Sequence, residues 1–262
     1  MSNGRTMQEI AWTGYVTIVR SEVRRFMRIK VQTLVPPVIT MTLYLYIFGS
    51  IIGRKVGSIL DMPYIQFIGP GIIAMALINN AYSNVSSSFF SSKNHRFCEE
   101  MFVAPVPSAS IVLGYISGGV LRGLLVMCLV SVVVYLFNPF AVHNIVVLVI
   151  AAVTSAVIFS ALGMVNAIVA GNHDEANWVN TYVVTPLTYM GGVFFPMTSL
   201  PTVIQPIAEL NPILMVVSSF RYGILGVEAG PLVLHLIALT ICAVVLVVVL
   251  INMIHHRYKL GE

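Results

Sequence analysis

Long apolar stretches recur along the chain, and short polar or proline-containing stretches separate them. A run of about 18 or more apolar residues is typical of a helix that crosses a lipid bilayer. The pattern therefore predicts an all-α polytopic membrane protein with six transmembrane helices, in one transmembrane domain that covers 1–262. We place the spans at 31–53, 63–91, 108–137, 143–170, 178–195 and 231–254.

The first segment, 6–29, has an amphipathic pattern. Apolar residues recur at spacings of three and four between Trp12 and Met27, whereas Arg20, Arg24 and Arg28 form a basic stripe on another face. Such a helix lies along the membrane surface with its basic face toward anionic head groups. The alternative, a helix in the core of a soluble domain, is disfavoured because the apolar runs leave no soluble domain for it to join.

The second predicted span turns polar in its second half. Side chains of this kind inside a membrane must face protein or a wet path, and they either form hydrogen bonds between helices or line a transport pathway. In the first two spans, Pro36-Pro37 and Gly69-Pro70-Gly71 are expected to kink or break the helix. The candidates for a pathway or a subunit interface are Asn79, Asn80, Ser83, Asn84 and, in the fifth span, Tyr182 and Tyr189.

The third predicted span contains two pairs of glycines and an arginine. The spacings Gly114/Gly118 and Gly119/Gly123 permit close approach of another helix. Arg122 lies near the middle of the span, where an uncompensated charge is expensive, so it serves either function or structural pairing. We favour a structural partner, either a carboxylate or the carbonyl groups at a helix end.

A charged segment, 92–107, separates the second and third spans. It carries Lys93 and two carboxylates among helix-forming residues, and Pro105 and Pro107 close it. Because buried charges would cost several kcal/mol each, this segment is expected to lie at a water interface, where a soluble protein can contact it. The residues assigned to this contact are Asn94, Arg96, Phe97, Glu99, Glu100, Met101 and Phe102.

The segment 196–228 is moderately apolar but interrupted by prolines, and it carries Glu209 and Arg221. Each half is shorter than the roughly 20 residues that a spanning helix needs. The pattern favours a re-entrant or interfacial helical hairpin whose backbone is sheltered by protein.

Positive charge sets the orientation. Six spans put both termini on one side, and the excess of Lys and Arg in membrane proteins lies in the cytoplasm. With the termini inside, the outer side holds only Arg54, Lys55 and Arg221. The cytoplasmic side then holds Arg5, Arg20, Arg24, Arg25, Arg28, Lys30, Lys93, Arg96, Arg257 and Lys259. Both termini and 92–107 are therefore expected in the cytoplasm, and 196–228 outside.

Composition narrows the function. The chain is 58% hydrophobic and only 9% charged, with a mean hydropathy of +0.91, and its net charge of +4 gives no reason to expect a nucleic-acid partner. The sequence contains no catalytic motif, metal-ligand cluster or GxxxxGK[ST] phosphate loop. We therefore expect no enzyme activity, catalytic residue, cofactor site or metal site in this chain, and any ATP hydrolysis must occur on another polypeptide.

Three stretches resemble the permease family of type-2 ABC exporters: CEEMFVAPVPSASIVLGY (Cys98–Tyr115), TPLTYMGGVFFPMTSLP (Thr185–Pro201) and LNPILMVVSSFRYGILG (Leu210–Gly226). Within that family the chain is most similar to the NodJ- and YadH-like permeases, as PPVITMTLY (Pro36–Tyr44) also indicates. The resemblance covers nearly the whole chain.

The resemblance implies a multi-pass protein of the bacterial cytoplasmic (inner) membrane. It implies a second copy of this chain and two copies of an ABC ATPase subunit, which bind ATP and Mg, around a path between the first, second and fifth spans. The ATPases would press on 92–107 and the N-terminal helix to export an amphiphilic, lipid-like, glycan or drug substrate. Two other functions remain open at this point, namely a non-transporting membrane scaffold or assembly factor and an ion-coupled carrier.

Overall fold

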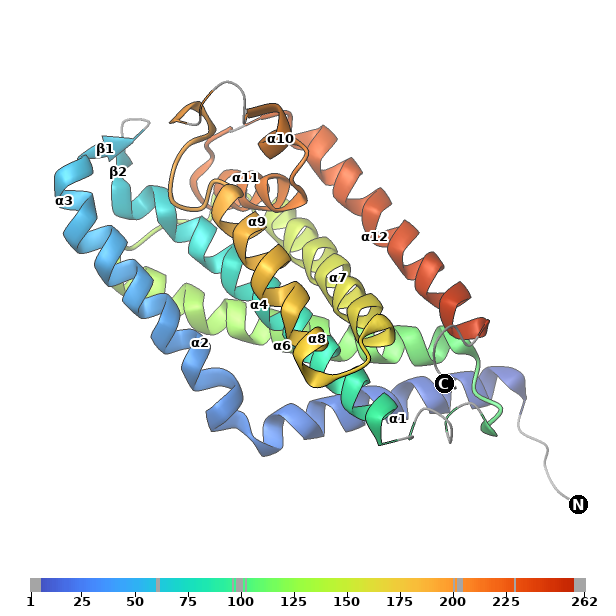
Figure 1. The fold of residues 1–262 in the computed structure, drawn as a ribbon. Helices are drawn as coiled ribbons and strands as arrows, with labels where there is room; N and C mark the ends of the chain where they lie inside the picture. The colour runs from blue at the N-terminus through green and yellow to red at the C-terminus, as the bar shows by residue number, and fades with distance from the viewer. Residues whose placement is uncertain are drawn as a thin grey trace, which may run out of the picture.

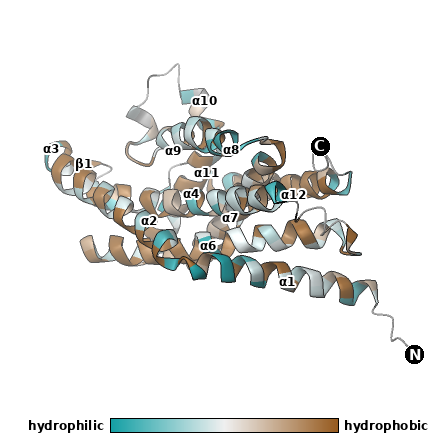
Figure 2. Cartoon of the chain, turned by 60° about the horizontal axis from the view of Figure 1, so that its bottom comes forward, coloured by the Kyte–Doolittle hydropathy of each residue, from teal (hydrophilic) through white to brown (hydrophobic). Residues whose placement is uncertain are grey.

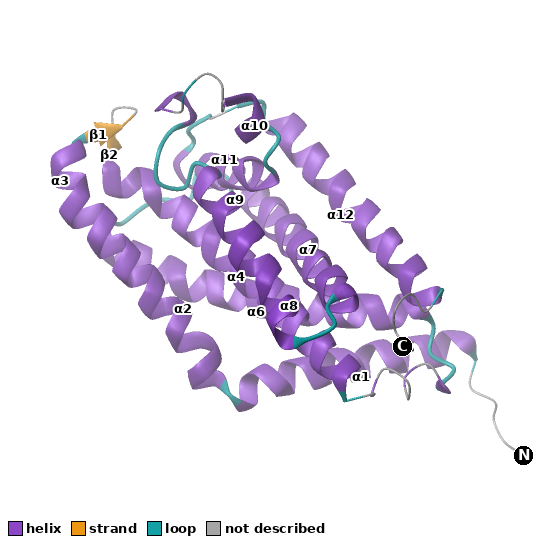
Figure 3. Cartoon of the chain, viewed as in Figure 1, coloured by secondary structure: helices purple, strands orange, loops and turns teal. Residues whose placement is uncertain are grey.

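The computed structural model describes residues 6–59, 62–95, 97, 101, 103–199, 201, 205–228 and 230–256. Almost all of this part of the chain is helical (Figure 3). The sequence assignments for Arg96, Glu99, Glu100 and Phe102 lie outside the described residues.

The amphipathic segment forms helix α1 (Met7–Arg28). A capping box starts it, because the Glu9 backbone N–H donates to the Thr6 hydroxyl (3.3 Å) and the Thr6 N–H donates to the Glu9 carboxylate (3.0 Å). The helix packs along the N-terminal half of α6 (Ser108–Phe137). Figure 2 shows hydrophilic colour at intervals along α1, whereas hydrophobic colour prevails on α2.

Five helices in the described residues are long and apolar enough to cross a membrane. The first is a continuous helix over Lys30–Val56, made of α2 (Lys30–Tyr44), the π-helix η1 (Leu45–Ile52) and α3 (Gly53–Val56). The others are α4 (Tyr64–Asn94), α6, α7 (Ile145–Val169) and α12 (Leu232–His255). α4 runs three residues beyond the predicted span and takes in the start of the predicted charged segment.

The prolines of the first two spans were expected to kink or break the helix, and the prediction of a break is wrong. α2 is helical through Pro36 and Pro37, and α4 is helical through Pro70. A proline removes one backbone hydrogen bond, which membrane helices tolerate where neighbouring groups take up the freed carbonyl. The regular α-helical pattern changes further along, where η1 replaces it with a π-helix after Tyr44.

The fifth predicted span is a composite helix that starts earlier than expected. It consists of α8 (His173–Val179), the π-helix η2 (Asn180–Val184) and α9 (Thr185–Met190). It is not among the five helices that are long and apolar enough to span. Polar residues recur along it, among them Asp174, Asn177 and Asn180. It ends where Gly192 takes a left-handed backbone (φ 71°), which glycine adopts without strain.

The remaining short elements gather at one end of the bundle, the upper end in Figure 1. They are the antiparallel strands β1 (Ser58–Ile59) and β2 (Met62–Pro63), η3 (Met197–Ser199), α10 (Gln205–Glu209) and α11 (Pro212–Leu225). The two helices of the segment expected to be a hairpin therefore differ in length. α10 has one turn, whereas α11 is longer and packs against α4 and α7. α1 and the C-terminal ends of α4 and α12 lie at the opposite end.

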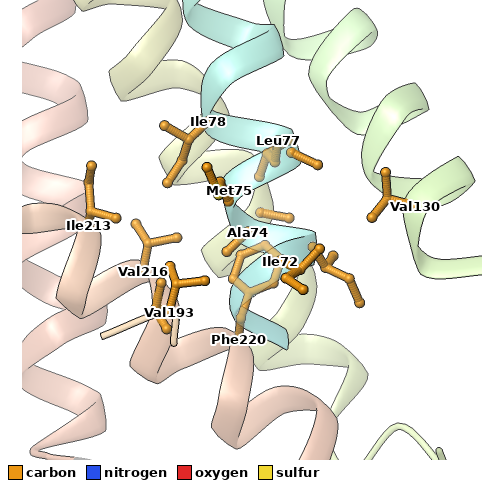
Figure 4. Close-up of a cluster of buried hydrophobic side chains, with 14 of the residues drawn as sticks. Ile72, Ala74, Met75, Leu77, Ile78, Val130, Val193, Ile213, Val216 and Phe220 are labelled. Atoms are coloured by element: carbon orange, nitrogen blue, oxygen red, sulfur yellow. The ribbon is translucent and has the colours of Figure 1, made fainter. Parts of the chain in front are cut away.

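Helix α4 is the centre of the bundle. In its most apolar window 83% of the residues are buried inside the chain, against 17% for α12. Its side chains Ile72, Met75 and Leu77 belong to a cluster that α6, α11 and Val193 complete (Figure 4). The outer helices α2 and α12 instead expose many apolar side chains, as helices that contact lipid do.

The glycine pairs of α6 allow close packing on two sides, as their spacing predicts. A Cβ atom at Gly118 would lie 2.6 Å from Cβ of Glu22 on α1, and one at Gly114 would lie 2.7 Å from Ile18. Gly119 and Gly123 instead approach α4. α6 is thus held between α1 and the central helix.

Candidate functional site

Helix α4 carries two polar stripes, each with a spacing of four residues. Asn79, Ser83 and Ser87 are partly or fully accessible, whereas the stripe one position on, Asn80, Asn84 and Ser88, is buried. Residues four apart lie on the same face of a helix, so the two stripes face different neighbours. The buried stripe forms hydrogen bonds to neighbouring helices, as one sequence interpretation expected. That the accessible stripe lines a pathway stays a prediction.

The buried stripe meets Glu22 of α1, whose side chain is nearly inaccessible. One carboxylate oxygen of Glu22 accepts hydrogen bonds from Arg25 (3.1 Å) and from the Asn84 amide (3.3 Å), and the other accepts one from Ser88. Arg25 also donates to the backbone carbonyl (3.1 Å) and side-chain oxygen (2.9 Å) of Asn84. The Arg25–Glu22 ion pair lies within α1. The hydrogen bonds from these two residues to Asn84 and Ser88 fix α1 to α4.

Arg122 reaches the same cluster from α6. Its guanidinium donates to the side-chain oxygens of Asn80 and Asn84, both at 3.4 Å, while its Nε has no hydrogen-bond partner. The sequence expectation of a carboxylate or helix-end carbonyl partner is therefore wrong for its direct contacts. Carbonyl groups at a helix end are instead bound by Lys93, which donates to the carbonyls of Ile168 (2.7 Å) and Ala170 (3.2 Å) at the end of α7.

The accessible stripe borders a cavity of about 320 Å³. Its wall is formed by α4, by Arg122 of α6 and by the face of α8 and η2 that carries His173, Asn177 and Asn180. Nearby, the Asn166 amide donates to the Ser86 hydroxyl (3.1 Å) and to the Ala176 carbonyl (2.7 Å), and these bonds hold α4, α7 and α8 together.

The predicted pathway tyrosines lie on the composite helix. Tyr189 on α9 forms a hydroxyl–hydroxyl hydrogen bond of 3.1 Å with Tyr44 on α2, so the two helices meet at this point. Phe194 packs against both rings. Tyr182 is 65% exposed and contacts Trp178. α2 and α9 therefore touch over α4 towards the end of the bundle that carries α10 and α11 (Figure 1).

Arg221 and Glu209, the two charges assigned to the outer hairpin, have opposite environments. Glu209 is exposed at the end of α10. Arg221 is 3% exposed, stacks on the Phe67 ring at 3.9 Å and donates to the Gly192 carbonyl at 2.9 Å. Burial lowers the pKa of the Arg221 guanidinium to about 10, so it remains a cation at neutral pH. It ties α11 to α4 and to the end of α9.

The described part of the charged segment lies against α1. Met101, Ala104, Pro105 and Val106 line a groove of about 400 Å³ together with residues 10–18 of α1. A Cβ atom at Gly14 would lie 2.8 Å from Val106, so the contact is tight. Asn94 is exposed at the end of α4, and Phe97 is exposed and stacked on His95.

The basic stripe of α1 is where the periodicity places it. Arg20, Arg24 and Arg28 are all exposed, on the side of the helix away from Glu22 and Phe26. Within the described residues, no group of three or more His, Cys, Asp and Glu side chains comes together that could hold a metal ion.

Glu22 and Arg25 are the residues of the cluster that sequence reasoning missed as partners. Both sit in a helix read as a surface element, where a Glu three residues before an Arg looks like an exposed pair. A signal was available, since Glu22 is an acidic position within the apolar face that includes Val19, Val23 and Phe26.

Comparison with known proteins gives the family. The family described as ABC-2 type transporter matches residues 13–225 of the chain. The inner membrane transport permease YadH of Escherichia coli is 50% identical over 227 residues, which cover 87% of this chain and 89% of that protein. Nodulation protein J of Sinorhizobium fredii is 25% identical over 205 residues, which cover 76% of this chain and 77% of that protein.

Proposed function

The chain belongs to the ABC-2 type transporter family, and on that premise we propose that it is the permease subunit of an ATP-driven exporter. It is a multi-pass protein of the inner membrane, as its similarity to an inner membrane transport permease and its five long apolar helices indicate. The observation that carries the proposal is the family match over 13–225, which includes most of α1, the charged segment and the outer elements.

In this proposal a separate ABC ATPase, which binds ATP and Mg, drives transport from the cytoplasmic end. The groove between α1 and residues 101–106 supports this role, because the two elements share one surface at the end of the bundle where α4 terminates. Force on the charged segment would be transmitted to α1 by the Gly14–Val106 contact and from α1 to the centre by the Glu22–Arg25–Asn84 bonds. Two ATPase copies would act on two copies of this chain.

The transport path in this proposal runs along the accessible stripe of α4. α2 and the composite helix α8–η2–α9 lie on either side of α4 (Figure 1), and in this proposal the contact between Tyr44 and Tyr189 closes the path toward the outer end. The π-helices η1 and η2 lie in these two flanking helices, and π-helical turns are frequent at functional sites. The exposed rings of Trp178 and Tyr182 suit contact with a second copy or with an amphiphilic substrate.

Co-purification tests the proposal. The tagged chain is co-expressed with each ABC ATPase of its cell in turn, and the detergent-solubilised complex is analysed by size-exclusion chromatography and native mass spectrometry. We expect a complex of two permeases and two ATPases whose ATP turnover exceeds that of the ATPase alone. Failure of the chain to pair with any ATPase of its cell would contradict the proposal and favour a scaffold or an ion-coupled carrier.

A further inference from the structure

The cavity between α4, α6 and the α8–η2 helix has the properties of a ligand site. Its volume of about 320 Å³ lies within the range of about 300–1,000 Å³ that small-molecule sites occupy. It is enclosed on three sides by different helices, and one wall belongs to the accessible stripe of α4. Its polar lining residues are Ser83, Ser87, Arg122, His173, Asn177 and Asn180.

Within the part of the chain that the structure describes, the guanidinium of Arg122 has neither a counter-charge nor a short hydrogen bond in this cavity. Its two hydrogen bonds are long, at 3.4 Å each, and both go to neutral amides. The described residues include no ion pair to Arg122, since the nearby Glu22 carboxylate is bonded to Arg25, Asn84 and Ser88. A guanidinium has five N–H donors, and even a partly buried cation such as Arg122 is costly without a counter-charge. An anion in the cavity would supply what the cluster lacks.

The other lining groups suit the same ligand. Asn180 Oδ1 is buried without a hydrogen-bond partner. Serine hydroxyls, an asparagine amide and a histidine beside an arginine form a donor set typical of phosphate or carboxylate recognition. The unpartnered acceptor at Asn180 would accept a hydrogen bond from a hydroxyl on the same ligand.

An apolar pocket adjoins this cavity at Tyr82, which lines both. The pocket also has a volume of about 320 Å³ and lies between η2, α9, α7 and α11. Its lining is almost wholly apolar and includes Phe159, Leu162, Val183 and Leu187. A polar, positively charged cavity next to an apolar pocket matches a molecule with an anionic head and a hydrocarbon tail.

From this juxtaposition we propose that Arg122 and the cavity around it bind the anionic phosphate headgroup of an amphiphile. This proposal rests on the proposed export function, because it takes the bound amphiphile to be the substrate, held beside the path before export. The competing hypothesis is that Arg122 has only a structural role and holds α6 to α4. Under that hypothesis no anionic ligand would depend on it.

Binding is measured on the permease alone, in detergent, as the rise in thermal midpoint when a ligand is added. The probes are dioleoyl-phosphatidylglycerol, dioleoyl-phosphatidylcholine (which has no net charge) and inorganic phosphate. We expect phosphatidylglycerol to stabilise the wild type more than phosphatidylcholine does. Stabilisation by inorganic phosphate to the same extent as phosphatidylglycerol would overturn the assignment to an amphiphile.

Three variants assign the effect to the cavity. Arg122→Gln should weaken phosphatidylglycerol binding by roughly 10- to 100-fold, as expected for a lost charge-assisted hydrogen bond, while Arg122→Lys should retain part of it. Arg54→Gln removes an exposed arginine of α3, at the other end of the bundle, and should leave binding unchanged. Equal phosphatidylglycerol stabilisation in wild type and Arg122→Gln would overturn the proposal, as would its absence in the wild type.

A fourth variant covers the case in which Arg122→Gln does not fold. Ser87→Asp places a carboxylate in the cavity, so we expect a higher thermal midpoint without lipid and loss of the phosphatidylglycerol effect. Unchanged lipid stabilisation in Ser87→Asp would refute the site. These measurements use no ATPase, so the two proposals fail separately. If the permease pairs with an ATPase but shows no Arg122-dependent lipid binding, only the proposed binding site is refuted. If it binds lipid in this way but pairs with no ATPase, only the export function is refuted.

Discussion

The ion pair between Glu22 and Arg25 yields a prediction that can be worked from the structure. Glu22→Gln keeps the shape of the side chain but removes the negative charge that faces Arg25 at 3.1 Å. Removing one partner of a buried pair costs about 3–5 kcal/mol. The Arg25 side chain is 35% exposed, so water screens it, and we discount the cost to about 1–3 kcal/mol.

A double-mutant cycle separates the interaction energy of the Glu22–Arg25 pair from the other effects of each substitution on stability. Arg25→Gln alone also breaks the bonds to Asn84, but the double variant Glu22→Gln/Arg25→Gln no longer contains the unpaired cation at position 25. We therefore expect the double variant to lose less stability than the sum of the two single variants, by about 1–2 kcal/mol.

The assay is thermal unfolding of the purified protein followed by tryptophan fluorescence. At about 2–4 °C per kcal/mol for a chain of this size, Glu22→Gln should lower the midpoint by roughly 2–12 °C. Glu228→Gln, which removes an exposed carboxylate at the other end of the bundle, is the matched control and should have no effect. A midpoint of Glu22→Gln equal to that of the wild type, or strictly additive losses in the cycle, would refute the reasoning.

Three further predictions concern the elements around the cluster. Gly14→Leu should push α1 away from the charged segment and reduce permease-stimulated ATP turnover, whereas Ser21→Leu, which adds the same side chain to the exposed face of α1, should not; equal turnover in both would contradict the contact. Arg221→Leu leaves the Gly192 carbonyl without its donor and should lower the thermal midpoint by several degrees, a result that an unshifted melting curve would disprove. Glu100→Lys should abolish co-elution with the ATPase while Glu228→Lys preserves it, and the assigned contact surface is wrong if both complexes survive.

The sequence predicted the helical architecture because hydrophobic length is a strong local signal. The third span shows this well, since α6 has the bounds 108–137 that the pattern predicts. The predicted breaks at the prolines 36, 37 and 70 were wrong because the effect of a proline depends on whether neighbouring groups bond to the freed carbonyl. That is a property of the tertiary structure. The polar first turn of α8 likewise blurred the start of the composite helix.

The candidate site was predictable in its members but not in their pairing. Arg122, Asn80 and Asn84 stand out by composition alone, since polar side chains within an apolar run must have partners. Which partners they have depends on how α1 crosses α6, and the glycines at 114 and 118 set that crossing by letting Glu22 come close. Because Glu22 is separated from Asn84 by 62 residues, no local pattern reveals the bond between them.

In the proposed mechanism, an ATPase that acts at one end of the bundle changes the path beside α4. The direct test is the rate at which a thiol reagent labels Ser87→Cys in the permease–ATPase complex, with the native cysteines replaced and with Ser58→Cys at the far end as control. Trapping the ATPase with ATP and vanadate should change the labelling rate at position 87 and leave that at position 58 unaltered. Identical rates at position 87 with and without trapping would contradict the account.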